Sequence, residues 1–245
     1  MTHSQWNGKK VAFLGDSITD KNHIGTTKNY WQYLEEMLGI EAVVYGINGD
    51  TWGGMQNQAR RLKEELGDEI DALSIFAGTN DFNGSLPLGK WYDIVPEEVN
   101  NRTTIMVSPR RHFAMDPGTL RGRINIALSY IKENFPRQQV FLLTPIHRAF
   151  FTCGPDNVQP DESFPNKLGL YVDEYIAAIK EAANVWAVPV IDLNALCGLF
   201  PLTPAHVSFF NNKDVDKLHP NADGHRRMAK AIACQLLAIP SDFKD

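Results

Sequence analysis

The sequence predicts an α/β protein: a three-layer α/β/α sandwich with a five-stranded parallel sheet of flavodoxin-like topology. Five short, nearly continuous apolar runs alternate with longer segments of helical period. Such runs are typical of strands that are covered on both faces by helices. The 245 residues are enough for one large core, and no repeat, low-complexity tract or linker divides them. We therefore expect a single domain over residues 1–245.

The predicted strands are the apolar runs at residues 11–14, 42–45, 72–77, 140–144 and 188–193. Right-handed crossovers between five parallel strands favour the flavodoxin-like order, and ligands then bind at the carboxyl ends of the strands.

Five amphipathic stripes predict the helices that cover this sheet. The first ends at Gly39, as helices often do at a glycine. The third ends before Pro136, which cannot continue a helix. The apolar positions of the five stripes are Trp31, Leu34, Leu38; Met55, Ala59, Leu62, Leu66; Ile124, Ala127, Leu128, Ile131, Phe135; Tyr171, Tyr175, Ile179, Ala182; and Met228, Ile232, Leu236, Ile239.

Two stretches, at about 82–118 and 147–165, have no clear helix and contain several prolines. Loops of this length in a compact domain are usually functional. Both begin directly after predicted strands, so we expect them to come together over the carboxyl edge of the sheet and flank the active site.

Composition excludes several classes of protein. The formal net charge of −5 argues against a nucleic-acid-binding protein or a protein that binds anionic membranes. No apolar run is long enough to span a bilayer. The run at 11–14 is too short for the core of a signal peptide. We expect a cytoplasmic location for the chain as it stands, and a secreted or periplasmic one if an export signal preceded it.

The three cysteines, Cys153, Cys197 and Cys234, are far apart in the chain and odd in number. We expect them to be reduced and mostly buried rather than disulfide-bonded or metal-ligating.

Polar residues follow the first two predicted strands. Ser17 lies in a tight turn after the first strand, where an exposed nucleophile is well placed; the alternative is a serine that only caps the turn. The second strand is followed by Gly46 and then by Gly49-Asp50-Thr51. A glycine there lets a backbone N–H approach a ligand, although a plain turn explains the same residues.

The third strand is followed by Gly78-Thr79-Asn80-Asp81. The Asn80 amide has the chemistry to stabilise an oxyanion, and its alternative role is to cap the turn.

Asp216 and His219 precede the last helix, three residues apart. On a turn, the carboxylate can hold His219 Nδ1–H and leave Nε2 free as a base. A surface acid beside an unrelated histidine is the alternative. His225 lies within the helix, and we expect it to be structural.

Together, these four blocks resemble the SGNH (GDSL-type) hydrolase superfamily. They occur in that family's order, each at a predicted strand end or at the final turn, and the resemblance spans residues 11–237. It implies that Ser17 is the nucleophile, His219 the general base and acid, and Asp216 its orienting partner. It also implies an oxyanion hole made of Ser17 N–H, Gly49 N–H and the Asn80 amide, with Gly46 as the fallback for Gly49.

The resemblance implies a serine esterase or acylhydrolase that acts on a small-molecule ester and needs no cofactor or metal. No nucleotide-binding glycine motif, no H-E-x-x-H and no G-x-S-x-G elbow is present. The two long segments mix aromatic residues with polar and basic ones and lack a sustained apolar run. We therefore expect short acyl groups on a polar alcohol such as a sugar. The alternatives are a lipase or lysophospholipase and, on the same fold, a non-catalytic binding module.

Overall fold

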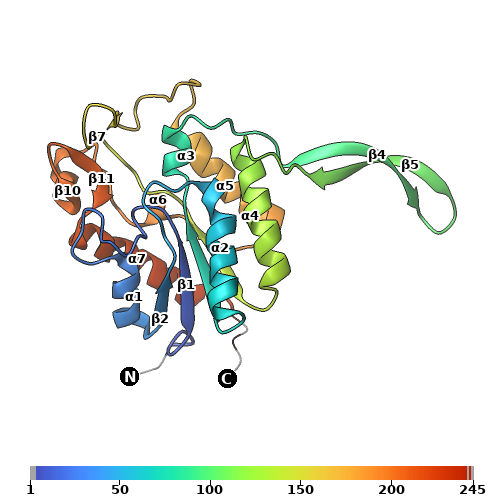
Figure 1. Ribbon diagram of the computed structural model, residues 1–245, viewed down its shortest axis with the longest axis horizontal. Coiled ribbons are helices and arrows are strands. Elements are labelled where there is room, and N and C mark those ends of the chain that lie inside the picture. Colours follow the sequence, from blue (N-terminus) through green and yellow to red (C-terminus); the bar gives the residue numbers. More distant parts are fainter. Residues whose placement is uncertain (1–3, 242, 244–245) are drawn as a thin grey trace.

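A five-stranded parallel sheet lies at the centre of the computed structural model, which describes residues 4–241 and 243 (Figure 1). The strand order is β2-β1-β3-β6-β9, the flavodoxin-like order that the sequence predicts. The strands are β1 (Lys10–Gly15), β2 (Glu41–Val44), β3 (Ala72–Phe76), β6 (Gln139–Leu143) and β9 (Val190–Ile191).

Helices cover both faces of the sheet (Figure 1). One apolar core packs α2, α4 and α5 against one face, and a second packs α1 and α7 against the other. The helices are α1 (Tyr30–Leu38), α2 (Trp52–Leu66), α4 (Leu120–Asn134), α5 (Val172–Trp186) and α7 (Ala222–Ala238), with the short α3 (Thr79–Asn83) and α6 (Leu193–Leu196) at strand ends.

Strand β1 shows why the sheet separates two cores. Val11 and Phe13 belong to one core, and Ala12 and Leu14 to the other, because successive side chains of a strand point to opposite faces. All four are buried, which explains the continuous apolar runs in the sequence.

Two predicted helix ends are confirmed, and each depends on the residue type found at the end of the helix. Gly39 ends α1 with φ 73°, a left-handed conformation that glycine adopts without strain. Helix α4 ends at Asn134, just before Phe135 and Pro136.

A second, antiparallel sheet lies beside the sandwich, in the order β10-β11-β7-β8. Its strands are β10 (Phe210–Asn212), β11 (Asp216–Pro220), β7 (Phe151–Thr152) and β8 (Val158–Gln159), and a 3-10 helix, η1 (Pro204–Phe209), precedes β10. The predicted turn at Asp216 and His219 is therefore wrong, because both residues lie on β11. Its partner β7 comes from far earlier in the chain, and a local pattern does not reveal such a pairing.

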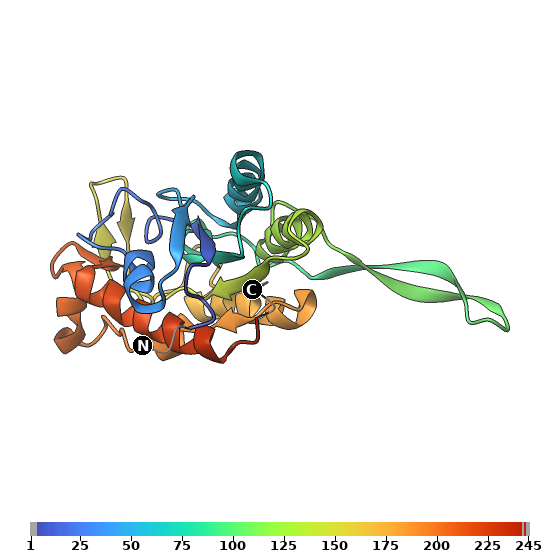
Figure 2. The same cartoon turned by 90° about the horizontal axis from the view of Figure 1, so that it is seen from below.

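The segment at 82–118 also differs from the prediction of an irregular loop over the active site. It forms a long hairpin of β4 (Tyr92–Asn100) and β5 (Ile105–Phe113) that projects away from the body of the molecule (Figures 1 and 2). Its strands rest on no core, so their apolar residues do not alternate in the way that identifies a half-buried strand.

The cysteines follow the prediction only in part. Cys197 is buried, but Cys153 and Cys234 are exposed, and all three are free. Within residues 4–241 and 243, no helix has the length and apolar character needed to cross a membrane.

Candidate active site

Three neighbouring strands bring predicted site residues to one edge of the sheet. Ser17 follows β1, Gly49 follows β2 and Asn80 follows β3, and the sheet order is β2-β1-β3. The Asn80 amide donates to the carbonyl oxygen of Asp50 at 2.9 Å, which joins the ends of β2 and β3. Since parallel strands share their carboxyl edge, side chains that are distant in the sequence meet here.

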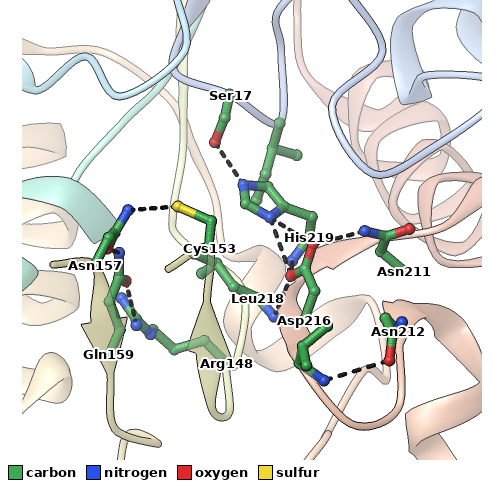
Figure 3. Close-up of polar contacts among 12 residues, drawn as sticks. Ser17, Arg148, Cys153, Asn157, Gln159, Asn211, Asn212, Asp216, Leu218 and His219 are labelled. Atoms are coloured by element: carbon green, nitrogen blue, oxygen red, sulfur yellow. Dashed lines mark hydrogen bonds and ion pairs between the residues drawn. The ribbon is translucent and has the colours of Figure 1, made fainter. Parts of the chain in front are cut away.

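Ser17, His219 and Asp216 form a hydrogen-bonded chain (Figure 3). Ser17 Oγ lies 3.0 Å from His219 Nε2. On the other side of the ring, His219 Nδ1 lies 3.0 Å from each carboxylate oxygen of Asp216. All three residues are buried. The carboxylate therefore orients the imidazole with Nε2 toward the serine hydroxyl.

The Asp216 carboxylate is itself held in place. The backbone N–H groups of Leu218 and His219 donate to its Oδ1, and the Asn211 amide donates to Oδ2 at 2.8 Å. Burial alone raises the pKa of Asp216, but the hydrogen bond and charge of His219 outweigh it, and the pKa is lowered overall. Asp216 is thus maintained as the anion that an imidazolium requires.

Part of the segment at 147–165 lies directly beside this chain of bonds. Strand β7 pairs with β11, and Phe151 is opposite Asp216. The Phe151 ring meets the His219 ring edge-on, with 5.1 Å between ring centroids. Phe151 and Asp216 together thus hold the imidazole from two sides.

The backbone N–H groups of Ser17 and Gly49, which follow the neighbouring strands β1 and β2, have no protein acceptor in the part of the chain that the structure describes. Gly49 has φ 79° and open space where a side chain would begin. Gly46 differs, because a Cβ there would lie 2.8 Å from the Cβ of Thr19. Gly46 is thus explained by packing, whereas the N–H of Gly49 is free to meet a ligand.

Asp16, next to Ser17, is fully buried. Its Oδ1 accepts from the Ile18 N–H, and its Oδ2 has no partner among residues 4–241 and 243. Burial raises the pKa of Asp16 to about 7, although the Ile18 N–H and the charge of His219 oppose this. The turn that presents Ser17 therefore contains a carboxyl group that stays protonated well above its usual range.

Gln58 of α2 is a site residue that sequence reasoning missed. Its buried amide accepts from Gly15 N–H at 2.9 Å, and its Nε2 donates to Gly15 O and to Asp50 Oδ2. It thereby ties the end of β1 to the turn after β2. A signal existed, because Gln58 is a polar residue in the apolar stripe of Met55, Ala59 and Leu62.

Sequence reasoning also missed Arg148, Asp20 and Asn211, and nothing in the local sequence of these residues indicates a role. Arg148 is buried, and its guanidinium donates to Thr79 Oγ1 and Gln159 Oε1. Burial lowers its pKa to about 10. Asp20 Oδ2 accepts from the N–H of Asn48, the residue before Gly49.

His225 has the structural position that we expected. It is buried on α7, stacks on the Tyr30 ring and accepts from the Tyr30 N–H through Nδ1. Burial lowers its pKa to about 3. Across the described residues, the structure brings no three His, Cys, Asp or Glu side chains into an arrangement that fits a metal ion.

The three-layer fold with its β2-β1-β3-β6-β9 sheet is the fold of GDSL-type hydrolases. The model of the GDSL-like lipase/acylhydrolase family matches residues 13–227, and the chain belongs to that family.

Similar proteins agree with this assignment. An acetylxylan esterase of Geobacillus stearothermophilus is 23% identical over 246 residues, which cover 92% of this chain and 93% of that protein. Among solved structures, a protein of Lactobacillus plantarum aligns with a TM-score of 0.73 at 25% identity, covering 95% of this chain and 98% of the other. A possible lipase of Chitinophaga pinensis aligns with a TM-score of 0.69 at 21% identity, covering 95% and 100%.

Proposed function

We propose that this protein is a serine esterase that cleaves carboxylic esters through Ser17, His219 and Asp216. The observation that carries the proposal is the chain of bonds from Ser17 Oγ to His219 Nε2 and from His219 Nδ1 to Asp216, each 3.0 Å long. A nucleophile, a base within reach of it and a carboxylate that orients the base together make a hydroxyl reactive.

The reaction begins when Ser17 Oγ attacks the ester carbonyl carbon while His219 Nε2 takes the hydroxyl proton. The carbonyl oxygen becomes an oxyanion. The N–H groups of Ser17 and Gly49 and the second N–H of the Asn80 amide, whose first is bonded to Asp50 O, are the donors proposed to stabilise it. The buried Asp216 stabilises the imidazolium that has formed.

The intermediate collapses when His219 Nε2 returns its proton to the leaving alcohol oxygen, and the acyl group remains on Ser17. Water then attacks the acyl carbon while Nε2 takes one of its protons. Collapse of the second intermediate releases the carboxylic acid, and the proton returns to Ser17 Oγ.

We infer a short acyl group on a polar alcohol as the substrate. A cavity of about 370 Å³ lies between the end of α3 and the segment at 156–167, and eight of its thirteen lining residues are polar or charged. One of them, Arg148, donates to Thr79 Oγ1, next to Asn80, and we take this cavity as the site for the alcohol. Such a lining suits a hydroxyl-rich alcohol better than an alkyl chain. The similarity to an acetylxylan esterase supports an acetylated carbohydrate.

Hydrolysis of p-nitrophenyl esters of increasing chain length tests the proposal. We expect kcat/KM to be highest for acetyl to butyryl esters and to fall steeply by eight carbons, with no activation by lipid interfaces. A preference for ten or more carbons would indicate a lipase or lysophospholipase instead. Absence of turnover on every ester would indicate a non-catalytic binding module.

Release of acetate from acetylated xylo-oligosaccharides tests the alcohol. We expect a higher kcat/KM on these than on ethyl acetate, because the cavity adds contacts to the sugar.

A further inference from the structure

Among residues 4–241 and 243, the hairpin of β4 and β5, called here the arm (Tyr92–Phe113), is the one long element that projects away from the core (Figures 1 and 2). Nine residues of each strand pair directly, from Tyr92 opposite Phe113 to Asn100 opposite Ile105. At the usual rise per residue of a strand, the arm is about 30 Å long.

The base of the arm is rigidly attached to the body. The buried amide of Asn125 donates to Trp91 O and to Ala114 O, the residues that flank the arm. Trp186 Nε1 donates to Asn125 Oδ1, and the Trp186 ring stacks on Phe113 with 4.2 Å between centroids. The direction in which the arm projects is therefore determined by packing and not by a loose hinge.

Beyond this base, the arm exposes apolar side chains on both of its faces. Ile94, Ile105 and Val107 are 66%, 67% and 67% exposed and lie on one face, and Val95, Val99 and Met106 are exposed on the other. An isolated two-stranded hairpin is only marginally stable in water, and contiguous exposed apolar surface usually marks an interaction site. The arm thus has the properties of an element that is covered by a partner.

Its edges are unsuited to strand addition. Pro96 lies directly opposite Pro109, at the middle of the arm. A proline has no N–H, so each outer edge lacks its central donor, and a third strand is disfavoured there. The partner is expected to pack against a face of the arm.

We propose that the partner is a second copy of this chain and that the arms of the two copies pack face to face about a twofold axis through the Pro96–Pro109 pair. One face carries, from base to tip, Ile94 with Arg111, then the two prolines, then Glu98 with Val107. A twofold axis at the prolines reverses this order. It places Ile94 opposite Glu98 of the partner subunit and Arg111 opposite Val107 of the partner subunit, so that Arg111 and Glu98 of the partner subunit are diagonal neighbours.

The charges agree with self-association. Glu98 has no ion pair in the described part of the chain, and Arg111 contacts only the Tyr92 ring. Asp93, Glu97 and Glu98 balance Arg102, Arg110 and Arg111, so the arm carries no net charge that would oppose a like partner.

The available area fits a weak dimer. One face of a ribbon of this length offers on the order of 300 Å², so the contact between two arms buries about 600 Å² in total. That is below the size of a standard stable interface, so we expect association that depends on concentration.

Sedimentation equilibrium of the full chain across a range of concentrations tests the proposal. We expect twice the monomer mass of 27.5 kDa. Val107→Glu should give the monomer mass, as should replacement of residues 95–110 by Asn-Gly, which closes the hairpin with a tight turn. Leu237→Glu on α7, a matched change at another exposed apolar residue, should leave the dimer intact. Far-UV circular dichroism shows whether each variant is folded.

A charge exchange tests the arrangement of the arms. Glu98→Arg and Arg111→Glu should each weaken the dimer at least tenfold, and mixing the two variants should restore it as a heterodimer. A monomeric wild-type chain at all concentrations, or an unchanged mass after removal of 95–110, would overturn the proposal. Failure of the mixture to dimerise would overturn the twofold arrangement.

Discussion

Ser17 and His219 act as one unit in the proposed reaction, so each should be equally indispensable. We expect Ser17→Ala and His219→Ala to reduce kcat for p-nitrophenyl acetate by about 10⁴-fold or more, and Asp216→Asn to reduce it less. The reason is that Asp216 only orients the imidazole and stabilises its charge.

Ser208→Ala is the matched control, because that serine is exposed and its hydroxyl bonds only to Ala205 O among the described residues. A serine-directed organophosphorus reagent should modify Ser17 alone, as read by peptide mass spectrometry. Full activity of Ser17→Ala would refute the assignment.

Asn80 is expected to act on the transition state more than on substrate binding. Asn80→Ala should lower kcat by roughly 10²–10³, with KM little changed, because the amide donates to an oxygen that is charged only during the reaction. Asn80→Asp should be worse, since a carboxylate repels the oxyanion. Asn57→Ala, an exposed asparagine on α2, is the control. An effect confined to KM would instead make Asn80 a ground-state binding residue.

Asp16 should couple the stability of the fold to pH. Its pKa is raised by burial to about 7 in the folded chain, so the folded state retains a proton that the unfolded chain releases near pH 4. Its contribution to stability is therefore fully present below about pH 4 and is lost as pH rises toward 7.

An asparagine, which mimics the protonated acid, removes this dependence. The free energy of unfolding of Asp16→Asn relative to the wild type should increase by up to about 1.4 kcal/mol per pH unit between pH 4 and 7 and then level off. Urea unfolding at several pH values measures it, with the exposed Asp214→Asn as control. If the difference in the free energy of unfolding between Asp16→Asn and the wild type did not change with pH, Asp16 would be ionised in the folded chain.

At the scale of elements, Gln58 connects helix α2 to the end of β1. Gln58→Met keeps the volume but leaves the Gly15 N–H without its acceptor, whereas Gly15 O keeps the Ile47 N–H as a donor. At about 1–3 kcal/mol for a buried group left without its partner, we expect a loss of about 1–3 kcal/mol in the free energy of unfolding, together with lower esterase activity.

Gln56→Met on the same helix is the control, because Gln56 is only half-buried and makes neither bond. Equal stability of the two variants would mean that Gln58 does not hold the end of β1.

At the scale of the whole molecule, the arm divides the chain into two halves that share one sheet. Strands β1 to β3 precede the arm, β6 and β9 follow it, and β3 pairs with β6 along five residues. Co-expressed fragments 1–101 and 102–245 should therefore associate, co-purify and hydrolyse p-nitrophenyl acetate. A break within β6, after Phe141, should prevent this because it divides a buried strand. Fragments that stay apart would show that the covalent link at the tip of the arm is needed for folding.

Much of the fold and site was predictable because the evidence for it is local. Short apolar runs identified the strands of the central sheet, and Gly39 and Pro136 marked helix ends. Ser17, Gly49 and Asn80 each follow a strand directly, and parallel strands bring their ends to one edge. For these residues, the fold class alone predicts the place in the structure from the place in the sequence.

Only the tertiary structure decided the rest, because it depends on pairing between distant segments. Strand β11 exists because β7 and β10 pair with it, and Asp216 is held by Asn211 and Phe151 in a way that no short pattern encodes. The arm escaped prediction for the opposite reason: beyond its base it packs on nothing in the described part of its own chain, so no buried face imposes an alternating pattern on its residues.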